Sequence, residues 1–318
     1  MTISSIYFYV IEILMTEWFE TGESWYPSKW GEGDQLGTLN LLNDQSVLRA
    51  IKIVKKGRII QLSHKIFNGM PGRYSAHGPF FHLLSQRVYD NRPPLREPTK
   101  NKFGGALCRL EMVDHLGTHL DSLNHIAFDN KFYNGFDAFQ ESTTFGTYNL
   151  GIDGVPPIVT RGILVDLTNE KEMILRRGRP IMVDETVNFL SNHNISVEPG
   201  DAIFFHTGVS KLWETPEIYN QYIDSSPGIG YELSKWIAEN DISVTGSDTP
   251  STEVVPPEIN GTRLPVHQYL ITKSGVRMID NIKLDELAKE KAYEFMFVCA
   301  PLKIKGSTAS PVAPVAIF

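Results

Sequence analysis

The sequence predicts a single mixed α/β domain, and three observations lead to this fold class. Helix and strand patterns alternate along the 318 residues, as expected when helices pack on a sheet. Several strand candidates are nearly continuous apolar runs, which is typical of strands covered on both faces. No internal repeat or low-complexity linker divides the chain. A chain of this length can bury a large core within one domain.

The predicted strands are β-branched and aromatic runs bounded by turn residues. They cover residues 162–167, 202–206, 242–245 and 293–299. The predicted helices carry spaced apolar residues and have a capping residue at one end or glycine at the other. They cover residues 44–56, 184–192, 231–240 and 285–291.

The composition excludes several classes of partner. The net charge is −7, and no stretch concentrates lysine and arginine as a nucleic-acid interface would. The apolar residues 6–15 are too few to span a bilayer, and they lack the basic start of a signal peptide. We therefore expect a cytoplasmic protein with no membrane or nucleic-acid partner, whose start is either Met1 or Met15. Cys108 and Cys299, each in apolar sequence, are expected to be buried thiols.

One eleven-residue run, from His115 to His125, carries the chemistry of the chain. It contains three of the nine histidines and one aspartate, at positions 115, 119, 121 and 125. Imidazole and carboxylate together are the usual ligands of zinc, manganese or iron. Burying so many polar groups without partners would be costly. The run therefore predicts a metal site.

The spacing of these residues predicts a bent ligand loop. On a helix, Asp121 would point roughly 200° away from His119 at ~100° per residue. On a strand, His115 and His119 would stand about 13 Å apart at ~3.3 Å per residue, too far for two ligands of one ion. Gly117 lies midway and tolerates the backbone angles of a bend. Thr118 can tie down a freed backbone group or a ligand.

The run closely resembles the His-x-Gly-Thr-His-x-Asp-x-x-x-His signature of the cyclase-like metal-dependent hydrolases, the family of bacterial kynurenine formamidase and isatin hydrolase. Weaker matches follow in family order at residues 30–40, 62–64, 69–71, 133–135, 161–166, 200–208, 247–251 and 300–306. The resemblance covers residues 30–318 and implies one α/β domain of the cyclase-like swivelling β/β/α type. Residues 1–29 are then an N-terminal extension.

The resemblance implies that His115, His119 and Asp121 are the primary ligands of a divalent metal ion, manganese or zinc. His125 would be either a further ligand or a catalytic acid/base. His267 matches a distant histidine of the formamidases, which together with a glutamate completes a second metal site, and it is also a candidate catalytic residue. Asp280 stands where that glutamate is usual and is one methylene shorter.

A second departure from the formamidases is Asn124, where a histidine often precedes the last histidine of the signature. Both departures favour the longer, isatin-hydrolase-like branch and a single-metal site. The resemblance implies attack by metal-bound hydroxide on the amide, lactam or ester of a small molecule such as an aryl formamide or isatin. It also implies a homodimer or larger homo-oligomer. Candidates for an aromatic wall are the pair Phe80 and Phe81, the segment around Trp213, and residues 18–30.

Three other functions are weighed. His119 and Asp121 with a distant histidine could form the facial triad of a non-haem iron oxygenase, but no arginine follows ten residues after His193 or His206. A nucleophilic hydrolase is disfavoured because the chain has no Gly-x-Ser-x-Gly elbow. A non-catalytic metal or ligand binder stays open. His206, at a predicted strand end, is equally well explained as a site residue or a packing residue.

Overall fold

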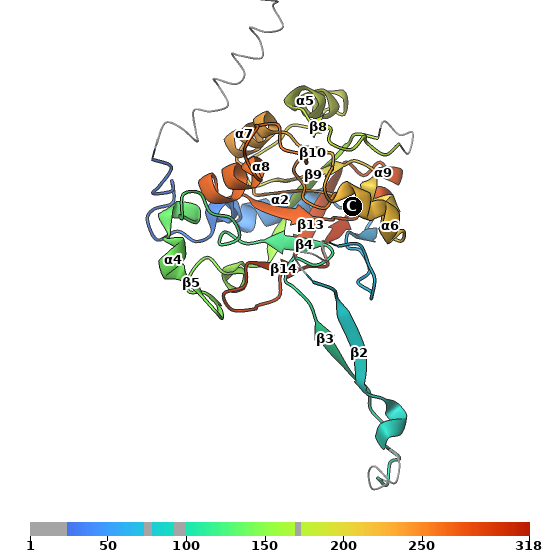
Figure 1. Cartoon of the computed structure of the whole chain (residues 1–318). Coiled ribbons are helices and arrows are strands. Elements are labelled where there is room, and N and C mark those ends of the chain that lie inside the picture. Colours follow the sequence, from blue (N-terminus) through green and yellow to red (C-terminus); the bar gives the residue numbers. More distant parts are fainter. Residues whose placement is uncertain (1–23, 73–77, 92–98, 169–172) are drawn as a thin grey trace, which may run out of the picture.

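The computed structural model describes residues 24–72, 78–91, 99–168 and 173–318. One mixed β-sheet forms the centre of the molecule, helices lie on both of its faces, and a two-stranded hairpin projects from the body (Figure 1). The predicted single mixed α/β domain is confirmed. In the described part of the chain, no helix is long and apolar enough to cross a bilayer.

The sheet has nine strands in the order β1-β15-β13-β7-β9-β11-β12-β4-β14. Their bounds are β1 Ile59–Gln61, β4 His119–Asp121, β7 Ile158–Asp166, β9 Ala202–His206, β11 Val244–Ser247, β12 Arg277–Asp280, β13 Glu294–Cys299, β14 Ala309–Pro311 and β15 Val315–Ile317. Strands β7, β9, β11 and β12 run parallel, and the strands on either side of them pair antiparallel. The carboxyl ends of the four parallel strands therefore lie at the same end of the sheet, where ligands of open α/β sheets bind.

The remaining strands form small sheets away from the centre. The projecting hairpin consists of β2 Phe81–Gln86 and β3 Leu107–Glu111. Two shorter pairs are β5 Ser142–Thr143 with β6 Gly146–Thr147, and β8 Pro180–Ile181 with β10 Gly228–Ile229.

The described helices are α2 Asp44–Ile53, α4 Ala138–Glu141, α5 Val183–Asn192, α6 Pro216–Tyr219, α7 Tyr231–Glu239, α8 Pro265–His267 and α9 Asp285–Lys289, with a π-helical turn η7 at Gln268–Lys273. Helix α2 begins where the Asn43 side chain caps two backbone N–H groups. It ends at Ile53, before the predicted Lys56, because the Lys56 N–H donates to the carbonyl of Phe318 beside the sheet.

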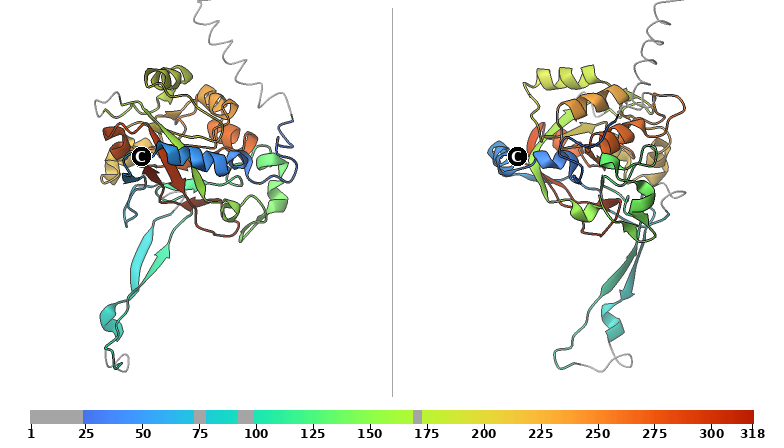
Figure 2. Two further views of the ribbon diagram at one scale, coloured as in Figure 1. Left: turned by 180° about the vertical axis from the view of Figure 1, so that it is seen from behind. Right: turned by 90° about the vertical axis from the view of Figure 1, so that its left-hand side faces the viewer.

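Two apolar clusters enclose the sheet. Ile163 and Val165 of β7 pack into the cluster that contains α5 and α7, which lie on the upper side of the sheet in Figure 1. Leu164, between them, packs into the cluster on the opposite face, where α2 lies across the sheet (Figure 2, left). Successive side chains of a strand point to opposite faces. The predicted coverage of both faces is therefore confirmed.

Two predictions need correction. The strand predicted to begin at Ile242 begins at Val244, because the N–H of Ile242 still donates to the carbonyl of Ile237 at the end of α7. Cys299 is buried as expected, but Cys108 is exposed. Cys108 lies on β3 of the projecting hairpin, whose surroundings the local sequence does not reveal.

Candidate metal centre

The predicted bend in the ligand run is present at Gly117. This glycine has φ +61°, in the left-handed region that favours glycine. His115 lies in the loop before the bend, and His119 and Asp121 belong to β4 after it. The Thr118 hydroxyl fixes the bend, since it donates to the carbonyl of Asn281 and accepts from the N–H of His64. The sequence-predicted role of Thr118 in tying down backbone groups is confirmed.

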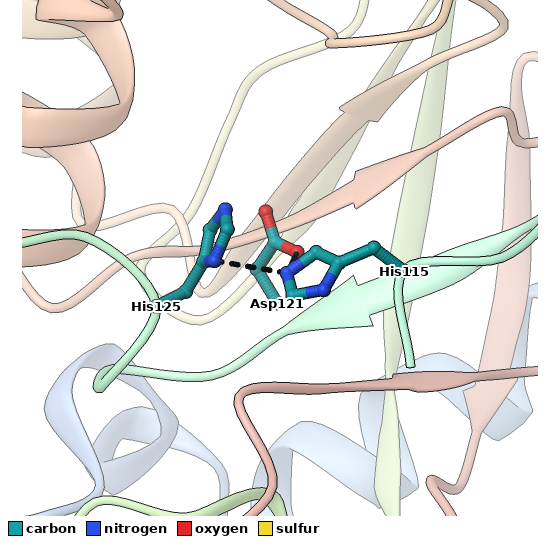
Figure 3. Close-up of side chains that lie close together, drawn as sticks. All are labelled: His115, Asp121 and His125. Carbon is teal, nitrogen blue, oxygen red and sulfur yellow. Dashed lines mark hydrogen bonds and ion pairs between the residues drawn. The ribbon is translucent and has the colours of Figure 1, made fainter. Parts of the chain in front are cut away.

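The bend brings His115, Asp121 and His125 together, as Figure 3 shows. Nε2 of His115 lies 2.9 Å from Nδ1 of His125 and 3.4 Å from Oδ1 of Asp121. One potential ligand atom from each of the three residues lies within 4.8 Å of the others. This is the spacing that a single cation needs, with bonds of about 2 Å to each ligand.

A second group shares Asp121 and draws on the neighbouring strand. Asp280 of β12 pairs with His119 of β4 across the antiparallel ladder. Nε2 of His119 lies 3.6 Å from Oδ1 of Asp121 and 3.7 Å from Oδ2 of Asp280. Nε2 of His267, on α8, lies 3.9 Å from the other oxygen of Asp121. The other five residues proposed from the sequence therefore lie around the Asp121 carboxylate.

The surroundings of the Asp121 carboxylate are suited to binding a cation. Its side chain is 1% exposed, and neither carboxylate oxygen has a hydrogen-bond donor among the described residues. Burial raises the pKa of Asp121, with His115 and His267 acting in the opposite direction. A buried carboxylate that lacks hydrogen bonds is costly, and a divalent cation would compensate that cost. The donor set of imidazoles and carboxylates suits manganese or zinc.

Three groups orient the imidazoles by binding their far sides, as partners of metal-binding histidines commonly do. Asp114 contacts Nδ1 of His115 at 2.8 Å, the carbonyl of Gly117 contacts Nδ1 of His119 at 2.9 Å, and Glu253 contacts Nδ1 of His267 at 2.5 Å. The far nitrogen of each ring is thereby fixed, and Nε2 faces Asp121.

Sequence reasoning missed Asp114 and Glu253. Asp114 directly precedes the ligand run, so its position next to His115 was an available signal. Burial acts to raise the pKa of Asp114, but hydrogen bonds from His115, Ser307 and Thr308 hold it well below its usual range. Glu253 lies fourteen residues from its partner His267, and no local pattern marks the pair.

The histidines of the site differ in charge. Burial acts to lower the pKa of His267, but Glu253 raises it to about 9. Burial lowers the pKa of His125 well below its ordinary value, and the neighbouring His115 and His267 lower it further. At neutral pH without a cation, His267 is therefore protonated and His125 is neutral. A neutral imidazole can accept a proton or ligate a metal.

A cavity of about 490 Å³ opens onto this centre. His115, His119, His125, His267 and Asp280 all line it. The walls are partly apolar and include Leu116, Ile126, Trp213 and Ile223. The predicted aromatic contribution from Trp213 is thus confirmed.

The other proposed aromatic walls do not line the cavity in the described part of the chain. Phe80 packs in the same apolar cluster as Trp213 but does not itself line the cavity. Phe81 lies on the projecting hairpin, and residues 18–23 lie outside the described residues.

Three further residues from the sequence motifs contact other side chains of the fold. His206 contacts Asp166 at 2.9 Å and belongs to a separate buried cluster that does not line the cavity, so it is not part of the metal centre. His64 stacks on Trp213 with ring centroids 4.4 Å apart. Asn124 donates from its amide to the hydroxyl of Thr147. This contact joins the ligand run to β6.

Comparisons with known proteins agree with this architecture. A family model named Cyclase matches residues 60–254. A crystal structure described as a novel cyclase is 27% identical, with a TM-score of 0.83, and the match covers 91% of this chain and 96% of that one. None of the curated proteins matches the chain.

Two isatin hydrolases share the fold at lower identity. Isatin hydrolase A from Ralstonia solanacearum is 18% identical, with a TM-score of 0.62, over 81% of this chain and 91% of that one. Isatin hydrolase A from Labrenzia aggregata, solved with benzyl benzoate, is 21% identical, with a TM-score of 0.58, over 84% and 94%. Because the family model spans more than half of the sequence, this chain belongs to the cyclase family.

Proposed function

We propose that this protein is a metal-dependent hydrolase that cleaves the amide, lactam or ester bond of a small molecule, such as an aryl formamide or an isatin-like lactam. The observation that carries the proposal is the buried Asp121 carboxylate, which has no hydrogen-bond donor and is surrounded by four imidazoles and a second carboxylate at the base of an open cavity. The fold is shared with isatin hydrolases, which supports a hydrolytic role.

His115, His119 and Asp121 would hold the cation, because Nε2 of His115 and Nε2 of His119 lie 3.4 Å and 3.6 Å from the same oxygen of Asp121. Asp280 and His267 stand where a second cation could be held. When bound, a divalent cation lowers the pKa of a water ligand and polarises a carbonyl oxygen. The role of His125 differs from that of the primary ligands. Its imidazole is neutral near neutral pH because burial lowers its pKa, so it can accept a proton when water attacks.

His267 is suited to the opposite proton transfer. Glu253 keeps its imidazole protonated near neutral pH, and its Nε2 faces the centre. It can therefore donate a proton to the leaving nitrogen or oxygen at the end of the reaction. In this mechanism His125 acts as the general base and His267 as the general acid.

The position and charge of Arg263 favour a substrate or product that carries a negative charge. It is exposed, lines the cavity, and has no hydrogen bond or ion pair with any described residue. Guanidinium groups bind carboxylates through paired hydrogen bonds. We propose that Arg263 orients a carboxylate on the substrate while apolar side chains such as Trp213 and Ile126 contact its ring.

The test combines metal analysis with a substrate panel. Purified protein should contain manganese or zinc, and it should hydrolyse at least one of several aryl formamides, isatin and lactones, tested with and without a carboxylate on the ring. His119→Ala should lose both bound metal and activity. His193→Ala is the matched control, because His193 packs on Phe189 and Tyr293 outside the cavity.

Three results would change the proposal. Bound metal without turnover of any panel member would favour a non-catalytic binder. Full turnover by metal-free His119→Ala would exclude the proposed mechanism. If Arg263→Gln had equal effects on charged and neutral substrates, Arg263 would not orient a substrate carboxylate. The rest of the proposal would be unaffected.

A further inference from the structure

Gln268 lines the cavity, and the proposed proton transfers give its side chain no role. It is the first residue of η7 and directly follows His267 at the end of α8. Its Nε2 donates to the carbonyl of Ala127 at 3.0 Å. Ala127 lies two residues after His125 and lines the same cavity. Gln268 therefore connects the segment that carries His125 to the segment that carries His267.

The hydrogen bond to Ala127 fixes which end of the Gln268 amide is free. A carbonyl oxygen can only accept, so the amide nitrogen must face Ala127 and the amide oxygen must point away from it. Oε1 of Gln268 accepts no hydrogen bond from a described residue. It is not enclosed by protein either, since it is not one of the buried polar atoms that lack a partner. A free acceptor therefore borders the cavity.

The other side-chain amide in the described part of the cavity wall has no such free acceptor. Asn281 also lines the cavity, but its Oδ1 accepts from the hydroxyl of Tyr219, and its Nδ2 donates to the carbonyl of Gly117 at 3.0 Å. Both ends of the Asn281 amide thus hold the ligand run in place. Gln268 uses only its nitrogen within the described chain, so its oxygen can bind an N–H or O–H group of a ligand.

The reacting bond of a substrate would lie close to Gln268. The imidazole rings of His125 and His267 have centroids 6.3 Å apart, and the Gln268 side chain bridges the two segments that carry them. In the proposed function, His267 donates a proton to the leaving atom of the substrate. That atom must therefore approach the helical segment to which both His267 and Gln268 belong. The nitrogen of a secondary amide or lactam carries a hydrogen that Oε1 of Gln268 can accept.

We propose that Gln268 is a specificity-determining residue, whose Oε1 accepts a hydrogen bond from the N–H of a secondary amide or lactam substrate. The inference rests on the proposed hydrolytic function and narrows its substrate class. An ester or lactone has an oxygen at the same position, which cannot donate and would face Oε1 with its lone pairs. An N-methyl amide lacks the hydrogen. A site that hydrogen-bonds a substrate group discriminates against analogues without that group, because its own polar atom is then left unpaired.

Three substrates that differ at one position test the role of Gln268. They are the best secondary amide or lactam of the panel, its N-methyl derivative, and the ester or lactone of the same ring. Wild-type protein should prefer the N–H substrate to its N-methyl derivative. Gln268→Met removes the acceptor and keeps a side chain of similar length, so kcat/KM for the N–H substrate should fall about 10- to 100-fold. The values for the other two substrates should stay nearly unchanged, and their intrinsic reactivity cancels between the two proteins.

Thr272→Val is the matched control. Thr272 belongs to the same π-helical turn, and its hydroxyl donates to the carbonyl of Ile126 at 2.9 Å, but it does not line the cavity. Like Gln268→Met, this variant removes one hydrogen bond to the wall formed by Ile126 and Ala127. Unlike Gln268→Met, it removes no free acceptor, so it should affect the three substrates equally. Circular dichroism and thermal denaturation check that both variants fold.

Two results would overturn the inference and leave the hydrolase proposal intact. They are equal losses on all three substrates in Gln268→Met, and the same loss of preference for the N–H substrate in Thr272→Val.

Absence of turnover for the whole panel would instead remove the proposed hydrolytic function. Calorimetry of isatin and N-methylisatin with wild-type protein and Gln268→Met would then decide the role of Gln268. Binding of isatin that is weakened in Gln268→Met, with no such change for N-methylisatin, would support recognition of the N–H group. Equal effects on both ligands, or no binding of either to the wild-type protein, would overturn it.

Discussion

Glu253 accepts a hydrogen bond from Nδ1 of His267 beneath the floor of the cavity, at 2.5 Å. The same carboxylate oxygen also accepts from the backbone N–H of His267. The imidazole is thereby fixed in both position and charge, with Nε2 facing Asp121. Asp114 occupies the corresponding place behind His115. At the scale of single residues, the site depends on these supporting carboxylates as much as on the ligands themselves.

Glu253→Gln tests the supporting role of this carboxylate. The amide removes the negative charge that keeps the His267 imidazole protonated, so we expect kcat/KM to fall about 10- to 100-fold. The measurement is steady-state hydrolysis of the best panel substrate, together with the metal content of the variant. Glu258→Gln is the matched control, because Glu258 is a partly buried carboxylate that accepts a hydrogen bond from the first N–H of α7 outside the cavity. Equal losses in the two variants would contradict a specific role for Glu253.

At the scale of elements, the ligand run combines a bend with a short strand. The left-handed conformation at Gly117 turns the chain between His115 and β4. An added Cβ at this position would meet Ile66 at 3.4 Å, an ordinary contact, so space does not require glycine. The backbone angle does, because left-handed residues with a side chain cost roughly 1–2 kcal/mol.

Gly117→Ala is therefore expected to lower the free energy of unfolding by about 1–2 kcal/mol and to weaken metal binding by displacing His115. Gly57→Ala is a matched control, since Gly57 has φ +65° with open space around it after α2. Urea denaturation should give similar losses for both variants. Metal titration should show weaker binding only in Gly117→Ala, and unchanged affinity there would show that the bend does not set the ligand geometry.

A second element-scale feature is the buried cluster at the carboxyl ends of β7, β9 and β11. His206 contacts Asp166 at 2.9 Å and lies 3.5 Å from Asp285 and 3.9 Å from Asp248. Burial acts to lower the pKa of His206, but the hydrogen bonds to Asp166 and Asp285 raise it to about 10. The imidazole is therefore charged when folded, and it neutralises carboxylates that lie beside the end of the sheet.

This raised pKa makes stability depend on pH in a defined direction. The stabilisation from protonated His206 is complete below its unfolded pKa of about 6.5 and is lost as the pH rises through about 10. His206→Gln should cost about 3–5 kcal/mol at pH 6, as when one partner of a buried pair is removed. The difference between wild type and variant, measured by urea denaturation, should shrink toward pH 10. A constant difference across this range would contradict the assignment.

At the scale of the whole molecule, the centre is assembled from distant parts of the chain. The run 115–125, Glu253, His267 and Asp280 meet because β4 inserts between β12 and β14 at one edge of the sheet. A cation held there would connect β4 and β12 through His119 and Asp280. It would bind the folded chain and not the unfolded one, in which these residues are far apart.

Binding should therefore stabilise the entire fold. Manganese or zinc at one hundred times its dissociation constant should add about 2.7 kcal/mol to the free energy of unfolding. Thermal denaturation of chelator-treated protein, with and without added metal, measures the effect. His119→Ala should show a much smaller increase in Tm than wild type. An equal increase in both would place metal binding elsewhere on the chain.

The sequence alone determined the ligand run, its bend at Gly117, the interleaved helices and the strands covered on both faces. These features depend on side-chain chemistry and backbone preferences within about a dozen residues, so spacing along the chain reveals them. Only the tertiary structure placed Asp280 beside His119, Glu253 behind His267, and His206 in a separate cluster. It also showed that Cys108 lies exposed on the projecting hairpin. Such contacts join residues far apart in sequence, and packing across the sheet decides which of them meet.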